Sequence, residues 1–496
     1  MEQGGPADQI FATSMKASAS GHASPAKGQN EGFLPIGTPI TLGSREWLQH
    51  WRYRYQPGGR KGACRARRNV SSILRLIEMN AESAQQQPAH GNTSTKGIRP
   101  TMLLLQAGML STASLLATSS ASPFDPHWAR YPRQFSAPYT PTPIAITGDI
   151  NKNIWQAIPW SDPFDEIRGA DDAPDGTRPP ATCSTRIKMC WDDDYLYIAA
   201  LVESDREVIA EFTERNSPIF QKDSDFEVFV DPGGSCHAYK ELELNANNIV
   251  WNLMLDKPYG DGGSEHSGRV SKPGDVQYYD VNGLKSATKV LQGKVNDSTP
   301  NSKTVWSVEI ALSHKDTLRS HPWASTPSVG SHWRINFSRV EDQGDINWTW
   351  QPQIVWDALE RRFMGKVDMH RPDAWGYVYF DGQIGTNNRN EGAEKAIDDD
   401  TPKDSTWPAR LAAMNVYYAQ VAYAEDNAGE YASDMQDLEG LVDETIVGPF
   451  DIEIDLSDNK KEYLVTVGID GISVQLTNDR LLTASIKKDA EQVAIE

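Results

Sequence analysis

The stretch YKELELNAN, residues 239–247, alternates polar and apolar side chains with a period of two. Successive side chains of a β-strand point to opposite faces of the sheet, so this period predicts a strand and not a helix. Leu242 and Leu244 then lie on one apolar face. The opposite face carries a phenol, two carboxylates and an amide, from Tyr239, Glu241, Glu243 and Asn245.

The same period recurs between residues 143 and 382, in short runs separated by Gly, Pro, Asn and Asp. These runs are rich in aromatic and β-branched residues, as strands are. Many short strands without long helices between them predict an all-β fold, an antiparallel β-sandwich over residues 143–382. The runs are STRIKMCW, DYLYIAALVE, DFEVFVDP, KELELNAN, IVWNLML, VWSVEIAL, HWRINFSRV and WGYVYF.

Two of these runs extend the polar face. In DFEVFVDP the alternation puts Glu227 and Asp231 on one side, and in HWRINFSRV it puts Arg334, Asn336 and Ser338 together. Carboxylates and amides bond neighbouring hydroxyls in pairs, which suits recognition of a polyol. An ordinary solvated face of an antiparallel sheet would show the same alternation, so that interpretation stays open.

The net charge of −20 argues against nucleic acid as a partner, because phosphate binding needs a basic surface. The charge is uneven. Before Met102 there are 13 Lys+Arg and 6 Asp+Glu, so this part is +7 and the remainder is −27. Residues 1–101 are also rich in Ser, Ala, Gly and Gln, which predicts a disordered, low-complexity extension.

Residues 102–122, MLLLQAGMLSTASLLATSSAS, have the layout of a secretory signal peptide, with Lys96 and Arg99 before an apolar run and small residues after it. We expect translation to start at Met102 or Met79 and the protein to be extracellular; otherwise its location stays unknown. The run is too short and too rich in Ser and Thr for a good transmembrane helix, so no stable membrane insertion is expected. A buried apolar helix is the alternative.

Metal and disulfide signals are weak. The spacing of the four cysteines fits no zinc motif, and after cleavage near residue 122 three would remain, enough for one pair and a free thiol. The acid run WDDDY at residues 191–195 is typical of a turn between strands. The acidic sheet face itself could hold a hard cation through carboxylate oxygens, although the sequence does not name the ligands.

The C-terminal part differs from the sandwich. Residues 383–405 are polar and acidic, which predicts a linker. Residues 406–496 begin with a helical pattern in which Pro408 suits the first turn, followed by the strand-like runs FDIEIDL, EYLVTVGI and ISVQL. This predicts a small α+β domain. Its helical stripe is expected to face a core: Leu411, Met414, Tyr418 and Val421.

Six motifs in this order resemble the carbohydrate-binding module family 9-like domain, over roughly residues 143–382: DINKNIWQAIPWSDPFDEIRG, IKMCWDDDYLYIAALVE, PIFQKDSDFEVFVDP, YKELELNANNIVWNLMLDKPY, INFSRVE and VDMHRPDAWGYVYF. The resemblance implies a β-sandwich of the DOMON-like group and non-catalytic binding of a poly- or oligosaccharide. It also implies association with glycoside hydrolases and carbohydrate catabolism, and calcium is sometimes bound structurally in that family.

The resemblance carries over to single residues only in part. The family's sugar-binding Glu corresponds to Glu227, and its polar pair on a later strand to Asn336 and Ser338. The family's Arg on the next strand falls at Glu243, so an anion replaces a cation. One aromatic of the family's ring clamp falls near Phe220 and the other at Met369, so the clamp of two Trp residues is not reproduced.

The sequence therefore predicts a sugar-binding surface without catalytic residues. Hydroxyl groups of the sugar would be bonded by Glu227, Glu241, Glu243, Asn245, Asn336 and Ser338. A sugar ring would stack on Tyr239, Trp251 or Phe220. The rim of the site would be closed by His370 and Arg371.

Three alternatives stay open. A glycosidase acting on O-glycosyl bonds would need two flanking carboxylates, but Glu241 and Glu243 are neighbours about 7 Å apart along one strand. A DOMON-like haem site would use Met369 or His370, with Met189 as a partner, and the last alternative is an adhesion or scaffold domain.

Overall fold

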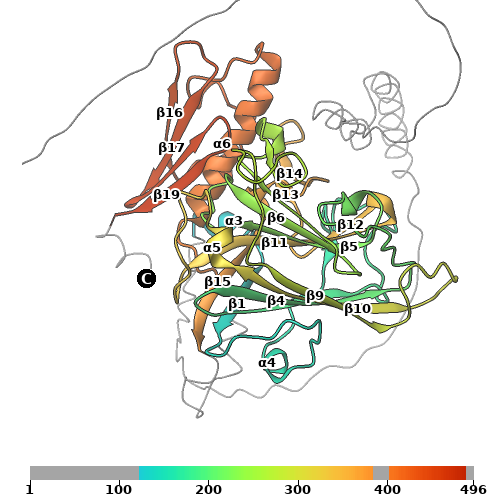
Figure 1. Ribbon diagram of the computed structural model, residues 1–496. Helices are drawn as coiled ribbons and strands as arrows, with labels where there is room; N and C mark the ends of the chain where they lie inside the picture. The colour runs from blue at the N-terminus through green and yellow to red at the C-terminus, as the bar shows by residue number, and fades with distance from the viewer. Residues whose placement is uncertain (1–121, 384–400, 488–496) are drawn as a thin grey trace, which may run out of the picture. The chain divides into compact units, whose positions relative to one another are not determined.

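The computed structural model describes residues 122–383 and 401–487 (Figure 1). The extension predicted at 1–101 lies outside the described residues, as do nearly all of the signal-peptide-like segment 102–122 and most of the linker 383–405. In the part of the chain that the structure describes, no helix is both long and apolar enough to cross a membrane.

All eight strands predicted from the alternating runs are present. They are β3 (Thr185–Trp191), β4 (Tyr195–Ser204), β5 (Asp225–Asp231), β6 (Tyr239–Asn245), β7 (Val250–Leu255), β10 (Thr304–Ser313), β11 (His332–Glu341) and β15 (Gly376–Gln383). Further short strands complete the sheets: β1 (Gln134–Tyr139), β2 (Asp165–Glu166), β8 (Glu265–His266), β9 (Lys285–Gln292), β12 (Ile346–Thr349), β13 (Ile354–Asp357) and β14 (Arg362–Gly365). The helices in this part are single turns: α3 (Asp125–Trp128), α4 (Asn153–Gln156), η2 (Ile219–Gln221), η3 (Tyr259–Asp261), α5 (His314–Thr317), η4 (Asp342–Gly344) and η5 (Pro372–Ala374).

One continuous strand order, β8-β7-β6-β5-β11-β15-β1-β3-β4-β10-β9, forms both layers of the sandwich. β1 is the strand that joins them. It pairs in parallel with β15 from Gln134 to Ala137, and after a register shift it pairs in parallel with β3 at Tyr139. The remaining pairings in this order are antiparallel, so the predicted antiparallel sandwich is confirmed, with β1 as a parallel exception.

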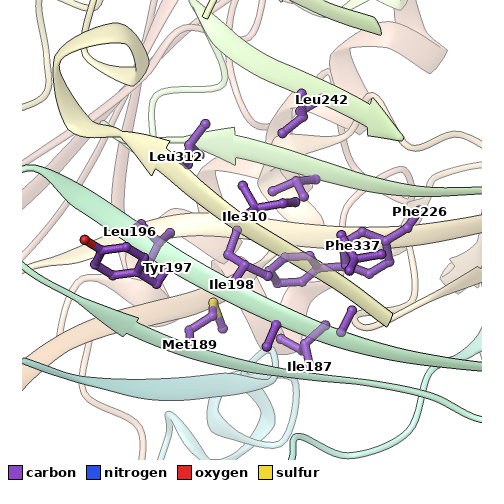
Figure 2. Close-up of a cluster of buried hydrophobic side chains, with 14 of the residues drawn as sticks. Ile187, Met189, Leu196, Tyr197, Ile198, Phe226, Leu242, Ile310, Leu312 and Phe337 are labelled. Atoms are coloured by element: carbon purple, nitrogen blue, oxygen red, sulfur yellow. The ribbon is translucent and has the colours of Figure 1, made fainter. Parts of the chain in front are cut away.

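The core between the layers is built from the apolar sides of the alternating strands. Figure 2 shows Ile187, Ile198 and Ile310 of one layer facing Phe226 and Phe337 of the other. Leu242 and Leu244, predicted to point inward, belong to this core. Of the twelve Trp residues between 128 and 375, nine are buried, so most of them fill the interior. Cys183, Cys190 and Cys236 are buried and free.

The other face of the β5–β6–β7 sheet is also buried. Phe229, Tyr239, Trp251 and Leu253 form a second apolar cluster with Ile219 of η2 and with Met369 and Trp375, which flank η5. Segments 219–222 and 367–375 therefore cover the face that the sequence left open to solvent.

The C-terminal part forms a helix on a sheet, as predicted (Figure 1). α6 (Trp407–Asp426) starts with Pro408 in its first turn, and α7 (Glu444–Val447) is a single turn. The sheet has β16 (Asp451–Leu456), β17 (Tyr463–Ile469), β18 (Ile472–Thr477) and one strand that the sequence pattern did not reveal, β19 (Leu482–Ile486).

From Trp407 to Gln420, α6 is buried on nearly all sides and not along one stripe, whereas its last turns are exposed or partly exposed. Leu411 and Met414 are buried as expected, whereas Val421, also assigned to the stripe, is 36% exposed. The helix shares a core with the C-terminal sheet and with Tyr377 and Tyr379 of β15. Because it has partners on two sides, a single apolar stripe underestimates its burial.

Arg480 in the turn before β19 fastens the C-terminal sheet to the sandwich. Its guanidinium lies 3.0 Å from a carboxylate oxygen of Asp261 and 3.2 Å from one of Asp373, and all three side chains are about 5% exposed. It also lies over the ring of Tyr417, 4.9 Å from the centroid. Removing one member of a buried ion pair leaves the other charge uncompensated.

We expect Arg480→Gln to lower the free energy of unfolding by about 3–5 kcal/mol, because Asp261 and Asp373 would stay buried without their cation. Urea denaturation followed by Trp fluorescence measures this. Lys460→Gln is the control, since Lys460 pairs with Glu430 at 3.6 Å with both side chains half-exposed. It should change the free energy by less than about 1 kcal/mol. Equal effects of the two substitutions would contradict the role of Arg480.

Candidate functional site

The strand register brings four carboxyl groups together on the covered face of the sheet. Glu227 of β5 lies directly opposite Glu243 of β6, and Asp225 lies opposite Asn245. Glu241 stands on the same face as Glu243, two residues away. One oxygen each of Asp225, Glu227 and Glu243 can be chosen so that all three lie within 4.8 Å of one another. We call Asp225, Glu227, Glu241 and Glu243 the acid cluster.

The acid cluster is shielded from water. Asp225, Glu227, Glu241 and Glu243 are exposed by 0%, 4%, 6% and 2%. Three of their oxygens have no hydrogen-bond partner: Oδ2 of Asp225, Oε2 of Glu241 and Oε2 of Glu243. Such buried, unsatisfied acceptors are rare in folded proteins and call for an explanation.

Burial also sets the protonation of these groups. Desolvation raises the pKa of Glu227 to about 7, and the neighbouring hydroxyl group of Ser338 partly offsets this rise. The pKa values of Asp225, Glu241 and Glu243 are raised well above their usual range, first by burial and then by repulsion from Glu227. Without a cation, these groups therefore bind protons more tightly than free carboxyl groups do.

Three residues predicted to bond hydroxyls make their hydrogen bonds within the protein. Asn245 donates to a carboxylate oxygen of Asp223 and accepts from the N–H groups of Asn247 and Ile249. Asn336 donates to the carbonyl of Gln351 and accepts from its N–H, and Ser338 donates to Asn347. These side chains hold neighbouring strands and loops in place.

The residues predicted to stack on a sugar, and His370 and Arg371 beside them, contact other side chains of the protein. Phe220 stacks on Trp251, with ring centroids 5.5 Å apart and 24° between the planes. Tyr239 is fully buried, and its hydroxyl lies 3.0 Å from Nδ1 of His370. Arg371 points to α6, where it donates to the hydroxyl of Tyr418. The haem alternative gains no convergent ligands, because Met189 lies in the core between the layers and Met369 in the cluster on the opposite face.

The acid run in WDDDY forms a turn, as predicted. Asp192 accepts from the N–H groups of Asp194 and Tyr195 and from the hydroxyl of Tyr197, and so closes the connection between β3 and β4.

Other residues of the candidate site escaped the sequence analysis. Asp225 has the same alternation as Glu227, so the period of DFEVFVD was a sufficient signal for it. Tyr259, Glu265 and Arg269 gave no such signal, because they follow β7 in a short connection and a two-residue strand. Arg269 pairs with Glu265, and its guanidinium lies 5.0 Å from the Trp251 ring centroid. Phe220 and Tyr259 are partly exposed, Arg269 is exposed, and the side chain of Glu265 is 8% exposed; we call these four residues the rim of the acid cluster.

A cavity of about 230 Å³ lies elsewhere, between the sandwich and the C-terminal part. Arg334, Trp356, Trp407, Arg410 and Tyr418 are among its lining residues. Arg334 and Arg410 already donate to protein groups there, to the carbonyls of Trp375 and Gly234.

Residues 146–358 match the family model described as carbohydrate family 9 binding domain-like. This part of the chain is similar to the domain of that family. The family 9-like domain includes the whole acid cluster and its rim, whereas the 230 Å³ cavity is lined partly by residues beyond it.

Three solved structures are similar to half of the chain. A candidate carbohydrate-binding protein from Bacteroides uniformis is 15% identical, with a TM-score of 0.36, and the match covers 50% of this chain and all of that one. Two structures of a family 9 carbohydrate-binding module from Caldicellulosiruptor kristjanssonii, with cellotriose and with glucose, are 16% and 17% identical, with TM-scores of 0.30 and 0.29. Each covers 52% of this chain and all of that one. A search of the curated proteins found no match.

We predict that, in protein treated with a chelator, ionisation of Glu227 lowers the free energy of unfolding as the pH rises. A rise of its pKa from 4.5 to about 7 on folding means that the folded state binds the proton more tightly, so the loss develops between these two values. It amounts to about 3 kcal/mol. In urea denaturation with EDTA, Glu227→Gln should therefore be more stable than the wild type at pH 8 and similar to it at pH 4.5. A variant less stable than the wild type at pH 8 would contradict this.

Proposed function

We propose that the family 9-like domain binds a carbohydrate without cleaving it, and that the glycan rests on the rim of the acid cluster. The observation that carries this proposal is the family match over residues 146–358, which contains both the cluster and the rim. The cavity beside α6 is the less favoured place, because part of its lining belongs to the C-terminal part of the chain.

The rim has the chemical groups that sugars require. Phe220 and Tyr259 offer partly exposed aromatic surface for the apolar face of a pyranose. Arg269 offers charged donors, which make the stronger hydrogen bonds to hydroxyls. The carboxylates beneath are buried beside one another and do not flank a bound chain, so the rim supports binding and not hydrolysis.

We also propose that the protein works outside the cell, in carbohydrate catabolism beside glycoside hydrolases. The signal-peptide layout of residues 102–122 supports export. N-terminal sequencing of the native protein tests it. We expect a mature start near Ser122, whereas an intact Met1 would contradict export.

Binding is tested by screening the full-length protein on a glycan array and then by calorimetry with the strongest hits, with glucose and cellotriose as defined probes. We expect Phe220→Ala to weaken binding about tenfold, or about 1.4 kcal/mol, because it removes an aromatic stacking surface. Arg269→Ala should weaken binding as well.

Arg178→Ala is the matched control for Arg269→Ala. Arg178 also pairs with a carboxylate, that of Asp165, but it is exposed and lies on another part of the domain. The Arg178→Ala variant should bind the glycan with the affinity of the wild type. Folded protein that binds no glycan would refute the proposal and favour an adhesion or scaffold role. Glycan binding that survives both Phe220→Ala and Arg269→Ala would move the site away from the rim.

A further inference from the structure

The acid cluster combines close oxygens with complete burial. The oxygens of Asp225, Glu227 and Glu243 lie within 4.8 Å of one another. Ligands on opposite sides of a calcium ion, each 2.3–2.6 Å from it, are roughly 4.6–5.2 Å apart. A single ion of that size can therefore touch all three carboxylates without rearrangement of the strands.

Glu241 supplies an independent observation. It stands outside this trio and is only 6% exposed. Its Oε2 has no hydrogen-bond partner. Its carboxyl group interacts with those of Glu243 and Glu227, so it faces the cluster. Its Oε2 is a buried acceptor without a donor beside three other carboxyl groups, which indicates a missing positive group.

The strand register explains why positive charge is needed here. It places the carboxyl group of Glu243 directly opposite that of Glu227, on neighbouring strands. Nearby, Arg269 pairs with Glu265 at the rim. The cluster thus needs either several protons or a cation to be neutral.

We propose that Asp225, Glu227 and Glu243, with Glu241 beside them, bind one hard divalent cation of the calcium class. Carboxylate oxygens are the ligands that calcium prefers, and four carboxylates can supply the six to eight oxygens of its coordination sphere when they bind in bidentate fashion. Magnesium fits less well, because it keeps several waters and demands shorter, octahedral contacts, whereas this site is dry. Soft metals are disfavoured by the absence of nitrogen or sulfur ligands in the cluster.

The ion would be structural. It lies beneath the sheet cover formed by segments 219–222 and 367–375, and it links β5 to β6 through carboxylates on both strands. It rests on the acid cluster and not on the glycan, so calcium binding does not depend on the proposed function.

The experiment is calorimetric titration of calcium chloride into full-length protein stripped with EDTA, with no sugar present. We expect one saturable site per chain. Glu243→Gln and Asp225→Asn should abolish this heat. The double variant D193N/D194N is the control, because it removes two exposed carboxylates of the other acid run, and it should bind calcium as the wild type does. Phe220→Ala should also keep calcium, which separates this test from the glycan test.

Thermal unfolding of the same proteins checks that the variants fold. With EDTA, Glu243→Gln should melt above the wild type, because a neutral amide replaces a buried carboxyl group that must take up a proton or carry an uncompensated charge on folding. With calcium the order should reverse, because only the wild type gains stability from the bound ion. No calcium heat in the wild type, or a calcium isotherm that Glu243→Gln leaves unchanged, would overturn the proposal. Melting of Glu243→Gln below the wild type by the same amount in both buffers would also overturn it.

Discussion

The sheet formed by β5, β6, β7 and β11 is buried on both faces, and the rest of the structure follows from this constraint. One face packs in the core between the layers through Phe226, Leu242 and Phe337. The other carries the acid cluster beneath η2 and the segment around η5. A sheet with one wet face would tolerate carboxylates there without cost, whereas a sheet covered on both sides must neutralise each of them.

The segment 367–375, which covers this face, is itself held by charged groups. Arg334 of β11 donates to the carbonyl of Trp375 and, from its other nitrogen, to that of Asp373, and so fixes η5 against the sheet. Asp373 in turn pairs with Arg480 of the C-terminal part. The C-terminal part therefore supports the segment that closes the acid cluster. Because the pair of Asp373 and Arg480 is buried, each of its charges depends on the presence of the other.

The sequence predicted the strands well because a period of two is a local property. The alternation in KELELNAN and DFEVFVDP assigned Leu242 and Phe226 to the core, and both lie there. It could not predict that the polar face is covered, since Ile219 and Trp375 reach it from segments that have no periodicity. The helical pattern likewise did not indicate that α6 contacts a second surface, formed by Tyr377 and Tyr379 of β15. Whether Glu227 and its neighbours take part in sugar binding stays a prediction, and Asn245, Asn336 and Ser338 already make hydrogen bonds within the protein.

The pairing of Glu243 with Glu227 limits what the face can do. A carboxylate opposite an arginine can stay ionised in a low-dielectric site and still offer its free oxygen to a hydroxyl. Two carboxylates opposite each other cannot, because repulsion and desolvation both favour protonation. A divalent ion restores the ionised state of Glu227 but occupies its oxygens, so contact with a sugar falls to more exposed groups such as Phe220 and Arg269. The floor and the rim of this face then have separate tasks.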